Sequence, residues 1–383
     1  MSASGERRAL ARVNVAAIER NCARLRAELR DGCELCAVVK ADGYGHGAAH
    51  SARAALAGGA TRLAVAGARE AVALRNAGFE EETVLVMGAL SPVELREALA
   101  ARAEVVVWSA AALRAVAAGG GGRVHVKLDS GMGRLGTRDA REATEVAELA
   151  ARTPGVVLVG VMTHFATADD RTDAFFDRQL ELFAEWARSV KEAHEGVVAH
   201  AANSAAVLRD RDAHFDMVRC GIAVYGMDPF GEDPRERGLE PALELVSYVA
   251  EVKSCAPGQS AGYGRGFIAE RETHLGVLPI GYGDGWRRGL SGNADVLVAG
   301  RRRPLVGTVS MDNLTVELGP EAEAGSLRGA EAVLLGTQGS ERVLAEDVAK
   351  RLRTINYEVT CGLTARVPRV YHRDGAPDEP RST

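Results

Sequence analysis

The sequence lacks the features that mark membrane proteins and nucleic-acid-binding proteins. No window holds the roughly 18 consecutive apolar residues that a membrane-spanning helix needs. Basic residues are not in excess, because the formal net charge is -5 and charges of both signs are spread along the chain. No basic patch therefore suits nucleic acid or anionic lipid. We expect a small-molecule partner, no nucleic acid, no membrane and a cytoplasmic location.

Cysteine is also scarce, and only one pair has a spacing typical of metal or redox chemistry. Six cysteines are present, of which Cys33 and Cys36 form a C-x-x-C pattern. No second pair or nearby histidine completes a zinc site, and the motif leads directly into an apolar stretch. We therefore expect no metal, and reduced thiols packed as small hydrophobic side chains.

What the chain does contain is a series of eight short apolar runs, each followed by a longer alanine-rich amphipathic stretch. The runs cover residues 35–40, 62–67, 83–88, 104–108, 123–129, 157–165, 197–203 and 217–226. Their apolar character is typical of a parallel sheet buried on both faces, and eight such strands close a barrel. The predicted fold class is α/β, with a (β/α)8 barrel; an open doubly wound sheet is the alternative.

The texture of the sequence changes after residue 235. Helix-length periodic segments become rare, and short strands separated by glycine take their place, as in THLGVLPIG, ADVLVAG and RPLVGTVS. A chain of 383 residues with 46% hydrophobic content is ample for two cores. We predict a barrel over residues 10–235, a mostly-β domain over 236–375 and a flexible tail over 376–383.

Chemistry in such barrels lies at the carboxyl ends of the strands, so polar residues there are candidate site residues. They are Lys40, Tyr44, Lys127, Asp129, Arg134, His164, Asn203, Ser204, Arg219 and Gly221. Any one of them alone is more often a solvated charge or a hydrogen-bonded core residue. Their coincidence at one end of the predicted barrel favours a functional site.

Lys40 indicates the kind of chemistry. A lysine that rises from a barrel strand among apolar neighbours has its charged form disfavoured, which exposes an amine for attack on a carbonyl group. Pyridoxal 5'-phosphate suits such a lysine. Ser204, the backbone around Gly221 and the hydroxyl of Tyr44 could hold its phosphate, because loops after the seventh and eighth strands often do so. The glycines that follow Lys40 would let the backbone approach the cofactor.

Nine motifs, in order and over nearly the whole chain, resemble those of the bacterial alanine racemases. They are AVVKADGYGHG, VKLDSGMGRLG, THFATAD, ANSAA, VRCGIAVYG, AGYGRGF, PIGYGDGW, VGTVSMD and YEVTCGLTARVPRVY. The resemblance implies a fold-type III pyridoxal 5'-phosphate enzyme, with a barrel and a C-terminal β-domain. It also implies a homodimer with shared active sites, and a first strand within residues 1–15 that adds to the β-domain. Departures are Asn14, where aspartate is frequent, and CGLTAR in place of a serine-rich stretch; neither touches the predicted bases.

The resemblance assigns roles residue by residue. Lys40 matches the lysine that holds the cofactor and serves as one base, and Tyr263 matches the opposite base, contributed by the other subunit. Arg134 matches the residue that holds the substrate carboxylate, while Lys127 lies where N6-carboxylysine often supports that arginine. The predicted cofactor contacts are His164 and Arg219 at the pyridine ring and, elsewhere on the cofactor, Tyr44, Asn203, Ser204, Gly221, Ile222 and Tyr357. The predicted partner-chain or entrance residues are Met311, Asp312 and Tyr282, with Met311 also donating its backbone N–H to the carboxylate.

Racemisation needs a base on each face of the substrate, which Lys40 and Tyr263 would supply. Arginine at the pyridine nitrogen would leave the ring a weaker electron sink than a carboxylate would, which limits transamination. The predicted function is the interconversion of L-alanine and D-alanine, which supplies D-alanine for peptidoglycan. A racemase of serine or of broader specificity is the nearest alternative, followed by a barrel-type decarboxylase. A non-catalytic pyridoxal phosphate carrier would lack both the C-terminal β-domain and a match to Tyr263.

Overall fold

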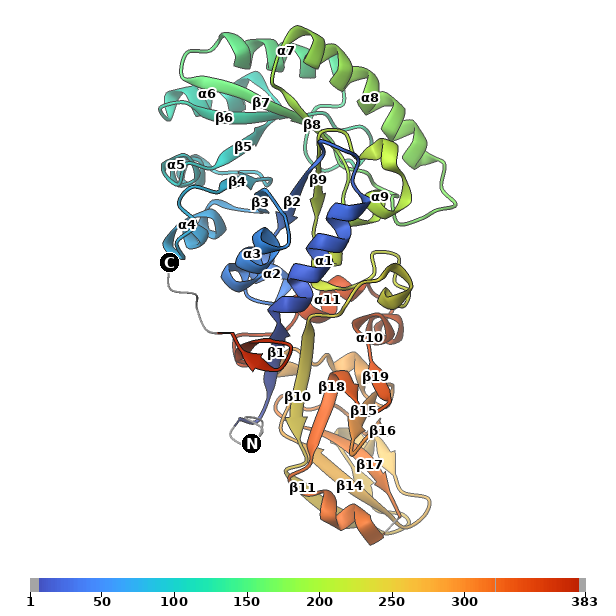
Figure 1. The fold of residues 1–383 in the computed structure, drawn as a ribbon. Coiled ribbons are helices and arrows are strands. Elements are labelled where there is room, and N and C mark those ends of the chain that lie inside the picture. Colours follow the sequence, from blue (N-terminus) through green and yellow to red (C-terminus); the bar gives the residue numbers. More distant parts are fainter. Residues whose placement is uncertain (1–6, 321, 379–383) are drawn as a thin grey trace. The chain divides into compact units, whose positions relative to one another are not determined.

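The computed structural model describes residues 7–320 and 322–378, whose contacts divide them into two compact units (Figure 1). The barrel unit consists of residues 18–224 and 228–230. The β-unit consists of residues 7–17, 225–227 and 231–378. None of the described helices is long and apolar enough to span a membrane.

The barrel unit contains a closed barrel of eight parallel strands, which confirms the predicted fold class. The strands are β2 (Glu34–Val38), β3 (Arg62–Val65), β4 (Thr83–Val86), β5 (Glu104–Val107), β6 (Gly122–Lys127), β7 (Val156–Met162), β8 (Val198–His200) and β9 (Met217–Cys220). Strand β2 pairs with both β3 and β9, so the sheet has no edge and the doubly wound alternative is excluded. Each of the eight apolar runs overlaps one strand.

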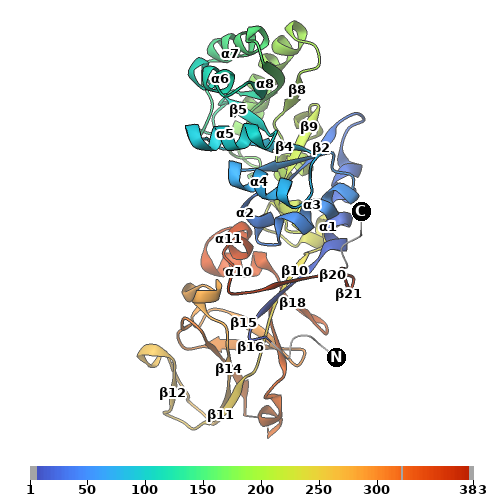
Figure 2. The same ribbon diagram turned by 90° about the vertical axis from the view of Figure 1, so that its left-hand side faces the viewer.

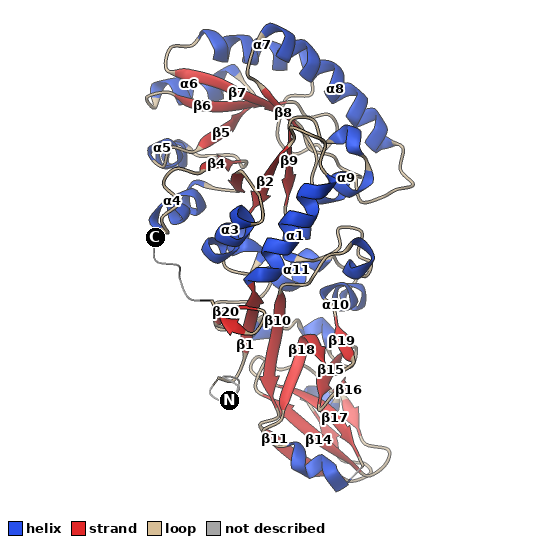
Figure 3. Ribbon diagram, in the orientation of Figure 1, coloured by secondary structure: helices blue, strands red, loops and turns tan. Residues whose placement is uncertain are grey.

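Helices cover the outside of this barrel, and the strands lie inside (Figure 3). They are α1 (Val15–Glu28), α3 (Ala48–Ala57), α4 (Ala68–Asn76), α5 (Pro92–Ala100), α6 (Ala110–Ala118), α7 (Ala140–Arg152), α8 (Phe175–Ala193) and α9 (Ser204–Arg209). The short α2 (Lys40–Tyr44) follows β2 and contains left-handed backbone instead of a regular helix. Local sequence explains their ends. At α5, Ser91 caps the helix, Pro92 occupies the first turn, and Glu94 bonds back to the Ser91 N–H at 2.9 Å.

The β-unit is mostly β, as predicted, and it is built on one large, mostly antiparallel sheet. Its order is β11-β14-β17-β16-β15-β18-β10-β1-β20-β21, with β19 paired to β18. The strands are β1 (Leu10–Asn14), β10 (Leu243–Tyr248), β11 (Glu251–Cys255), β14 (Thr273–Leu278), β15 (Asp295–Val298), β16 (Arg301–Val306), β17 (Leu314–Gly319), β18 (Glu331–Gln338), β19 (Glu341–Val343), β20 (Arg369–Arg373) and β21 (Ala376–Pro377). Two short helices, α10 (Ala345–Leu352) and α11 (Asn356–Cys361), belong to the same unit.

Strand β1 joins the two ends of the chain within this sheet. It pairs antiparallel with β10, where Leu10 lies opposite Val246, and parallel with β20, where Ala11 lies opposite Arg369. The expected tail over residues 376–383 differs at its start, because β21 pairs with β20. The rest of that tail from residue 379, and residues 1–6 of the expected N-terminal segment, lie outside the described residues.

Candidate active site

Lys40 lies two residues beyond β2 and opens a turn of left-handed backbone. Residues 41–43 have φ angles of 52°, 51° and 63°, and Tyr44 follows with 53°. A left-handed conformation costs about 1–2 kcal/mol for each residue that is not glycine. The turn carries the chain round so that the Lys40 Nζ lies 5.9 Å from the centre of the Tyr44 ring.

Two carboxylates hold this strained turn in place. Glu70 accepts hydrogen bonds from the N–H groups of Ala41 and Ala66, both at 2.7 Å, which ties the turn to the β3–α4 connection. Asp42 accepts from the N–H of Ala48 at 2.8 Å, at the start of α3. The position of Lys40 is therefore imposed by contacts from elsewhere in the barrel unit, as is usual for strained backbone at functional sites.

Tyr44, Ser204 and Gly221 together form a cradle for an anion. The Ser204 Oγ accepts hydrogen bonds from the N–H groups of Gly221 at 3.0 Å and Ala223 at 3.4 Å. A Cβ atom at position 221 would lie 2.3 Å from the Tyr44 hydroxyl, so only glycine fits there. The hydroxyl groups of Ser204 and Tyr44, which meet at Gly221, are of the type that binds a phosphate group.

Two further predicted cofactor contacts flank this cradle. The Asn203 Oδ1 caps α9 by accepting from the Ala206 N–H at 3.0 Å, which orders the turn that carries Ser204. Ile222 is buried directly after Gly221 and begins a short 3-10 helix. Asn203 thus orders the turn that carries Ser204, and Ile222 adds a buried apolar side chain next to Gly221.

Arg219 on β9 is almost fully buried and is surrounded by hydrogen-bond acceptors. Its Nη1 donates to His200 Nδ1 at 2.7 Å and to the carbonyl of His200 at 3.0 Å. Its Nη2 donates to Thr163 O, Ala201 O and His164 Nδ1, at 2.8, 3.0 and 3.1 Å. Burial lowers the pKa of Arg219 to about 10, so the group stays charged at neutral pH. Among the described contacts only the Nε–H has no acceptor, which leaves one donor for a ring nitrogen.

His164 lies among four cationic side chains. Its pKa falls well below the ordinary value because of burial first, then because of the charges on Arg219, Arg134, Lys127 and Lys40. The imidazole is therefore neutral and accepts from Arg219 at Nδ1, so its proton lies on Nε2. A group of cations of this kind favours anionic ligands such as a phosphate or a carboxylate.

Lys127 is poorly matched to its surroundings as an ammonium ion. It is 4% exposed, and burial followed by the charges of Arg219 and Arg134 lowers its pKa to about 8. The loop that carries Arg134 is held by Asp129, which accepts from the N–H groups of Gly131 and Gly133 at 3.1 and 2.9 Å. Asp129 therefore organises the VKLDSGMGRLG motif, and Arg134 itself is exposed at its tip.

Tyr263 belongs to the β-unit and lies at the tip of a small hairpin. The hairpin strands β12 (Ser260–Ala261) and β13 (Phe267–Ile268) lie beside β11 and β14 (Figure 2). Ala261 and Phe267 pack against a core of Cys255, Ala269 and Leu275. The Tyr263 carbonyl accepts from Thr308 Oγ1 at 3.0 Å, while its side chain is 73% exposed. The backbone of this tyrosine is anchored and its phenol projects from the unit.

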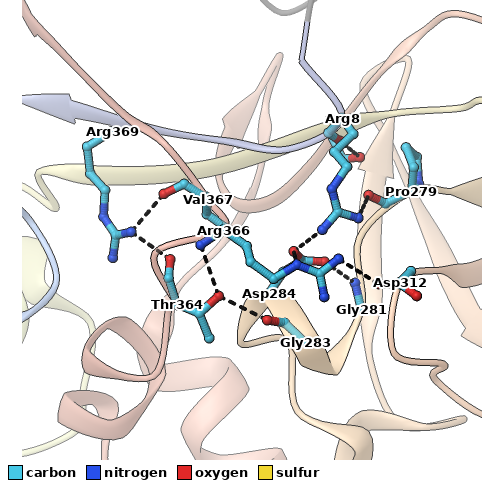
Figure 4. A network of polar contacts seen from close by, with 11 residues as sticks. Arg8, Pro279, Gly281, Gly283, Asp284, Asp312, Thr364, Arg366, Val367 and Arg369 are labelled. Carbon is cyan, nitrogen blue, oxygen red and sulfur yellow. Dashed lines mark hydrogen bonds and ion pairs between the residues drawn. The ribbon is translucent and has the colours of Figure 1, made fainter.

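Asp284 lies at the centre of a network that joins the PIGYGDGW and VSMD motifs (Figure 4). Its buried carboxylate accepts from the Gly281 N–H at 3.0 Å and pairs with Arg8 and Arg366. Arg366 also donates from Nη2 to Asp312 Oδ1 at 2.6 Å. The predicted site residue Asp312 is thereby tied to the interior of the β-unit.

The same network fixes Tyr282 and Met311. The Tyr282 N–H donates to Ser310 O at 3.0 Å, and the Gly283 N–H donates to Met311 O at 2.9 Å. A Cβ atom on Gly281 would lie 2.2 Å from Ser310 O, so these two loops can approach only through glycine. Tyr282 and Met311 are 40% and 51% exposed and belong to one hydrogen-bonded block.

The structure thus brings together the predicted residues of the barrel unit, and in the β-unit it links Tyr282, Met311 and Asp312. Tyr357, predicted at the phosphate, lies on α11 in the β-unit with Tyr263, Tyr282, Met311 and Asp312. Sequence reasoning did not single out Thr163 and His200, which bind Arg219. Polar residues inside or at the end of apolar barrel strands were the available signal for them.

Two family models cover most of the chain. They are "Alanine racemase, N-terminal domain" over residues 13–229 and "Alanine racemase, C-terminal domain" over residues 242–371. An alanine racemase of Geobacillus stearothermophilus is 41% identical over 376 residues, covering 95% of this chain and 93% of that protein. The solved alanine racemase of Streptomyces coelicolor A3(2) has a TM-score of 0.90 at 37% identity, covering 97% of this chain and 99% of that one. That of Bacillus anthracis, with bound L-Ala-P, has a TM-score of 0.88 at 35% identity and covers 97% of both chains. The chain therefore belongs to the alanine racemase family.

Proposed function

We propose that this chain interconverts L-alanine and D-alanine with pyridoxal 5'-phosphate, which Lys40 holds covalently. The observation that carries the proposal is the convergence of Lys40, Lys127, Arg134 and Arg219 on neutral His164 in the barrel unit. The cradle of Tyr44, Ser204 and Gly221 in the same unit fits the phosphate. When bound, the cofactor makes the α-proton of the amino acid acidic by accepting electrons into its ring.

The bases in this proposal are Lys40 on one face of the substrate and Tyr263 of a second copy of the chain on the other. One removes the α-proton and the other returns a proton from the opposite side. A tyrosine acts as a base only beside groups that favour its anion. His164 suits that role, because its Nδ1 accepts from Arg219 and its Nε2–H remains as a donor.

The carboxylate of alanine would bind Arg134 and the backbone N–H of Met311. Arg134 is supported by Lys127, which we propose is carbamylated. An unmodified lysine with a pKa of about 8 is mostly protonated at neutral pH, so it offers no acceptor to Arg219 or Arg134, whose charges act on it. A carbamate would supply a negative charge and two oxygen acceptors at the same place. Tyr282 and Tyr357 would narrow the entrance and favour a small side chain.

The active sites would be shared between two copies of the chain in a homodimer. The large exposed side chains of Tyr263, Met311 and Tyr282 in the β-unit support this proposal, since exposed apolar groups of this kind are typical of surfaces that another chain covers. Supply of D-alanine to peptidoglycan, in the cytoplasm, completes the proposal and rests on the family alone.

The direct test is a product assay. Purified protein would be loaded with pyridoxal 5'-phosphate and incubated with each L-amino acid, and the D-enantiomer, keto acid and amine products would be measured. We expect rapid formation of D-alanine until the enantiomers are equal, with little pyruvate. Formation of an amine would indicate a decarboxylase, and faster turnover of serine than of alanine would assign the site to another substrate.

A further inference from the structure

A network of four buried polar side chains, called the polar network below, runs through the interior of the barrel. Glu104 on β5, His125 on β6, His200 on β8 and Arg219 on β9 are all at most 3% exposed. Glu104 Oε2 lies 2.8 Å from His125 Nε2, His125 Nδ1 lies 2.9 Å from His200 Nε2, and His200 Nδ1 lies 2.7 Å from Arg219 Nη1. Barrel interiors are ordinarily filled with branched apolar side chains, so four connected polar groups need a reason.

Arg219 and Glu104, at the two ends of the polar network, determine the position of every proton between them. Arginine can only donate, so His200 Nδ1 is an acceptor and the His200 proton lies on Nε2. That proton is donated to His125 Nδ1, so the His125 proton lies on Nε2 and is donated to Glu104. Burial lowers the pKa of both imidazoles, which keeps each neutral with a single N–H. All the hydrogen bonds therefore point from Arg219 towards the carboxylate.

Further charged side chains surround Glu104, at one end of the polar network. Glu104 also accepts from Arg123 Nε at 2.8 Å and from Arg62 Nη1 at 3.3 Å. Burial alone would raise the pKa of Glu104, but hydrogen bonds from His125 and Arg123 and the charge of Arg62 lower it to about 2. The carboxylate is thus ionised and remains an acceptor for His125. All three of these side chains lie at or near the first residue of their strands: Glu104, Arg62 and Arg123. The polar network therefore links the amino-terminal end of the barrel to the site.

The barrel wall is adapted to this arrangement. The register between β6 and β7 shifts at His125, because Val124 pairs with Leu158 and His125 with Gly160. The shift places glycine directly opposite the imidazole, and a Cβ atom at position 160 would lie 2.1 Å from His125 Nδ1. Bulges of this type re-aim side chains next to active sites. The same atom, Nδ1, makes the bond to His200.

We propose that Glu104, His125 and His200 are positioning residues for Arg219. Because the polar network presents His200 Nδ1 as an acceptor, it fixes one edge of the Arg219 guanidinium. The Nε–H of Arg219 then points towards the ligand that binds in the site. This role rests on the proposed function in so far as that ligand is the cofactor ring. The order of the protons does not depend on it.

The test compares Glu104→Gln with Glu34→Gln. Glu34 accepts a hydrogen bond from Arg62 Nε but has no hydrogen bond to His125 or His200. Glu34→Gln therefore removes a carboxylate charge beside the same arginine and leaves the polar network unchanged. Glu104→Asp, which keeps the charge, is the conservative variant. Nitrogen-15 NMR of the imidazoles and of the Arg219 Nε–H, with and without pyridoxal 5'-phosphate, reports the tautomers and the exchange of the Arg219 proton with solvent. Steady-state kinetics with alanine reports kcat and KM.

We expect Nε2–H tautomers at His125 and His200 in the wild type and in Glu34→Gln. In Glu104→Gln we expect mixed tautomers, faster exchange of the Arg219 Nε–H, and a fall in kcat of about tenfold with unchanged KM, equivalent to about 1.4 kcal/mol of barrier. Glu104→Asp should recover much of each effect. Wild-type tautomers in Glu104→Gln would overturn the proposal, as would altered tautomers with unchanged exchange and kcat. If the wild-type enzyme has the expected tautomers but does not racemise alanine, the proposed function is wrong. The positioning role would then be decided by the exchange of the Arg219 Nε–H in Glu104→Gln.

Discussion

At the scale of single residues, Lys40 is the group whose replacement has the clearest expected result. Lys40→Ala should leave protein that binds no pyridoxal 5'-phosphate covalently, has lost its yellow colour and has lost activity by roughly 10²–10⁴-fold or more, because a general base and the attachment point disappear together. Absorption spectra and racemisation rates would be compared with those of Lys253→Ala, an exposed lysine on β11. Borohydride reduction followed by peptide mapping that placed the cofactor on another lysine would contradict the assignment.

Lys127 allows a second test at this scale. The intact mass of the protein should exceed the sequence mass by one carbon dioxide, because a buried amine with a lowered pKa beside two guanidinium groups favours a carbamate. Lys127→Ala should lose most activity, and a short carboxylic acid such as acetate should restore part of it by reaching Arg134. Chloride at the same ionic strength is the matched control. An unmodified mass together with no rescue would leave Lys127 as a plain amine.

Single residues also show how far the site can be predicted from sequence. The sequence predicts Lys40, Ser204 and Arg219 as site residues because a barrel puts its chemistry at the carboxyl ends of its strands. It does not predict His125 and His200, because their significance is a hydrogen bond between positions 75 apart in the chain. A histidine in an apolar run does not say which side chain it faces, and only the closed barrel supplies the partner.

At the scale of elements, the left-handed turn after β2 allows opposite effects from two neighbouring substitutions. Ala41→Gly should stabilise the protein by about 1 kcal/mol, because glycine adopts positive φ without the cost that alanine pays and the Ala41 side chain is exposed. Gly43→Ala should destabilise it by about 1–2 kcal/mol, because φ is +63° and the new Cβ would lie 2.9 Å from Ser51 Oγ. Thermal and denaturant unfolding of cofactor-free protein would measure both.

Cofactor affinity provides the control on this interpretation. Gly43→Ala should also weaken binding of pyridoxal 5'-phosphate, since Tyr44 follows directly and its hydroxyl lies against Gly221. Ala41→Gly should leave that affinity close to wild type, because Glu70 still holds the turn through the backbone N–H. Equal stability in all three proteins would mean that the turn carries no strain.

The eight strands of the barrel were predicted correctly in number and type, and less well at their ends. The first apolar run continues to Lys40, whereas β2 ends at Val38, and Val39 is fully buried without belonging to the strand. Ala201 and Ala202 are buried after β8 in the same way. An apolar run in the sequence therefore includes residues that are buried beyond the end of the strand as well as residues that pair within it. The left-handed turn was not foreseen, because Ala41 and Asp42 adopt it under contacts from residues distant in sequence.

At the scale of the whole molecule, the shared active site predicts that two inactive variants restore each other. When Lys40→Ala and Tyr263→Ala chains are unfolded together and refolded, roughly half of the dimers should be mixed, and each of these has one site with both bases. About a quarter of wild-type activity should therefore return, by that arithmetic. Each variant refolded alone is the control. Native mass spectrometry that shows mixed dimers without recovered activity would place both bases in one chain.

The position of β1 between β10 and β20 has a consequence for biosynthesis. Residues 10–14 leave the ribosome well before their partners at 243–248 and 369–373 are made. The barrel strands are all synthesised before residue 221, so the barrel can close while β1 still waits for its neighbours. During that interval the N-terminal strand is an unpaired edge, which is the kind of segment that chaperones shield and that aggregates when it is left exposed. Completion of the large sheet is thus a late step, set by the synthesis of β10 and β20 rather than by the folding of the barrel.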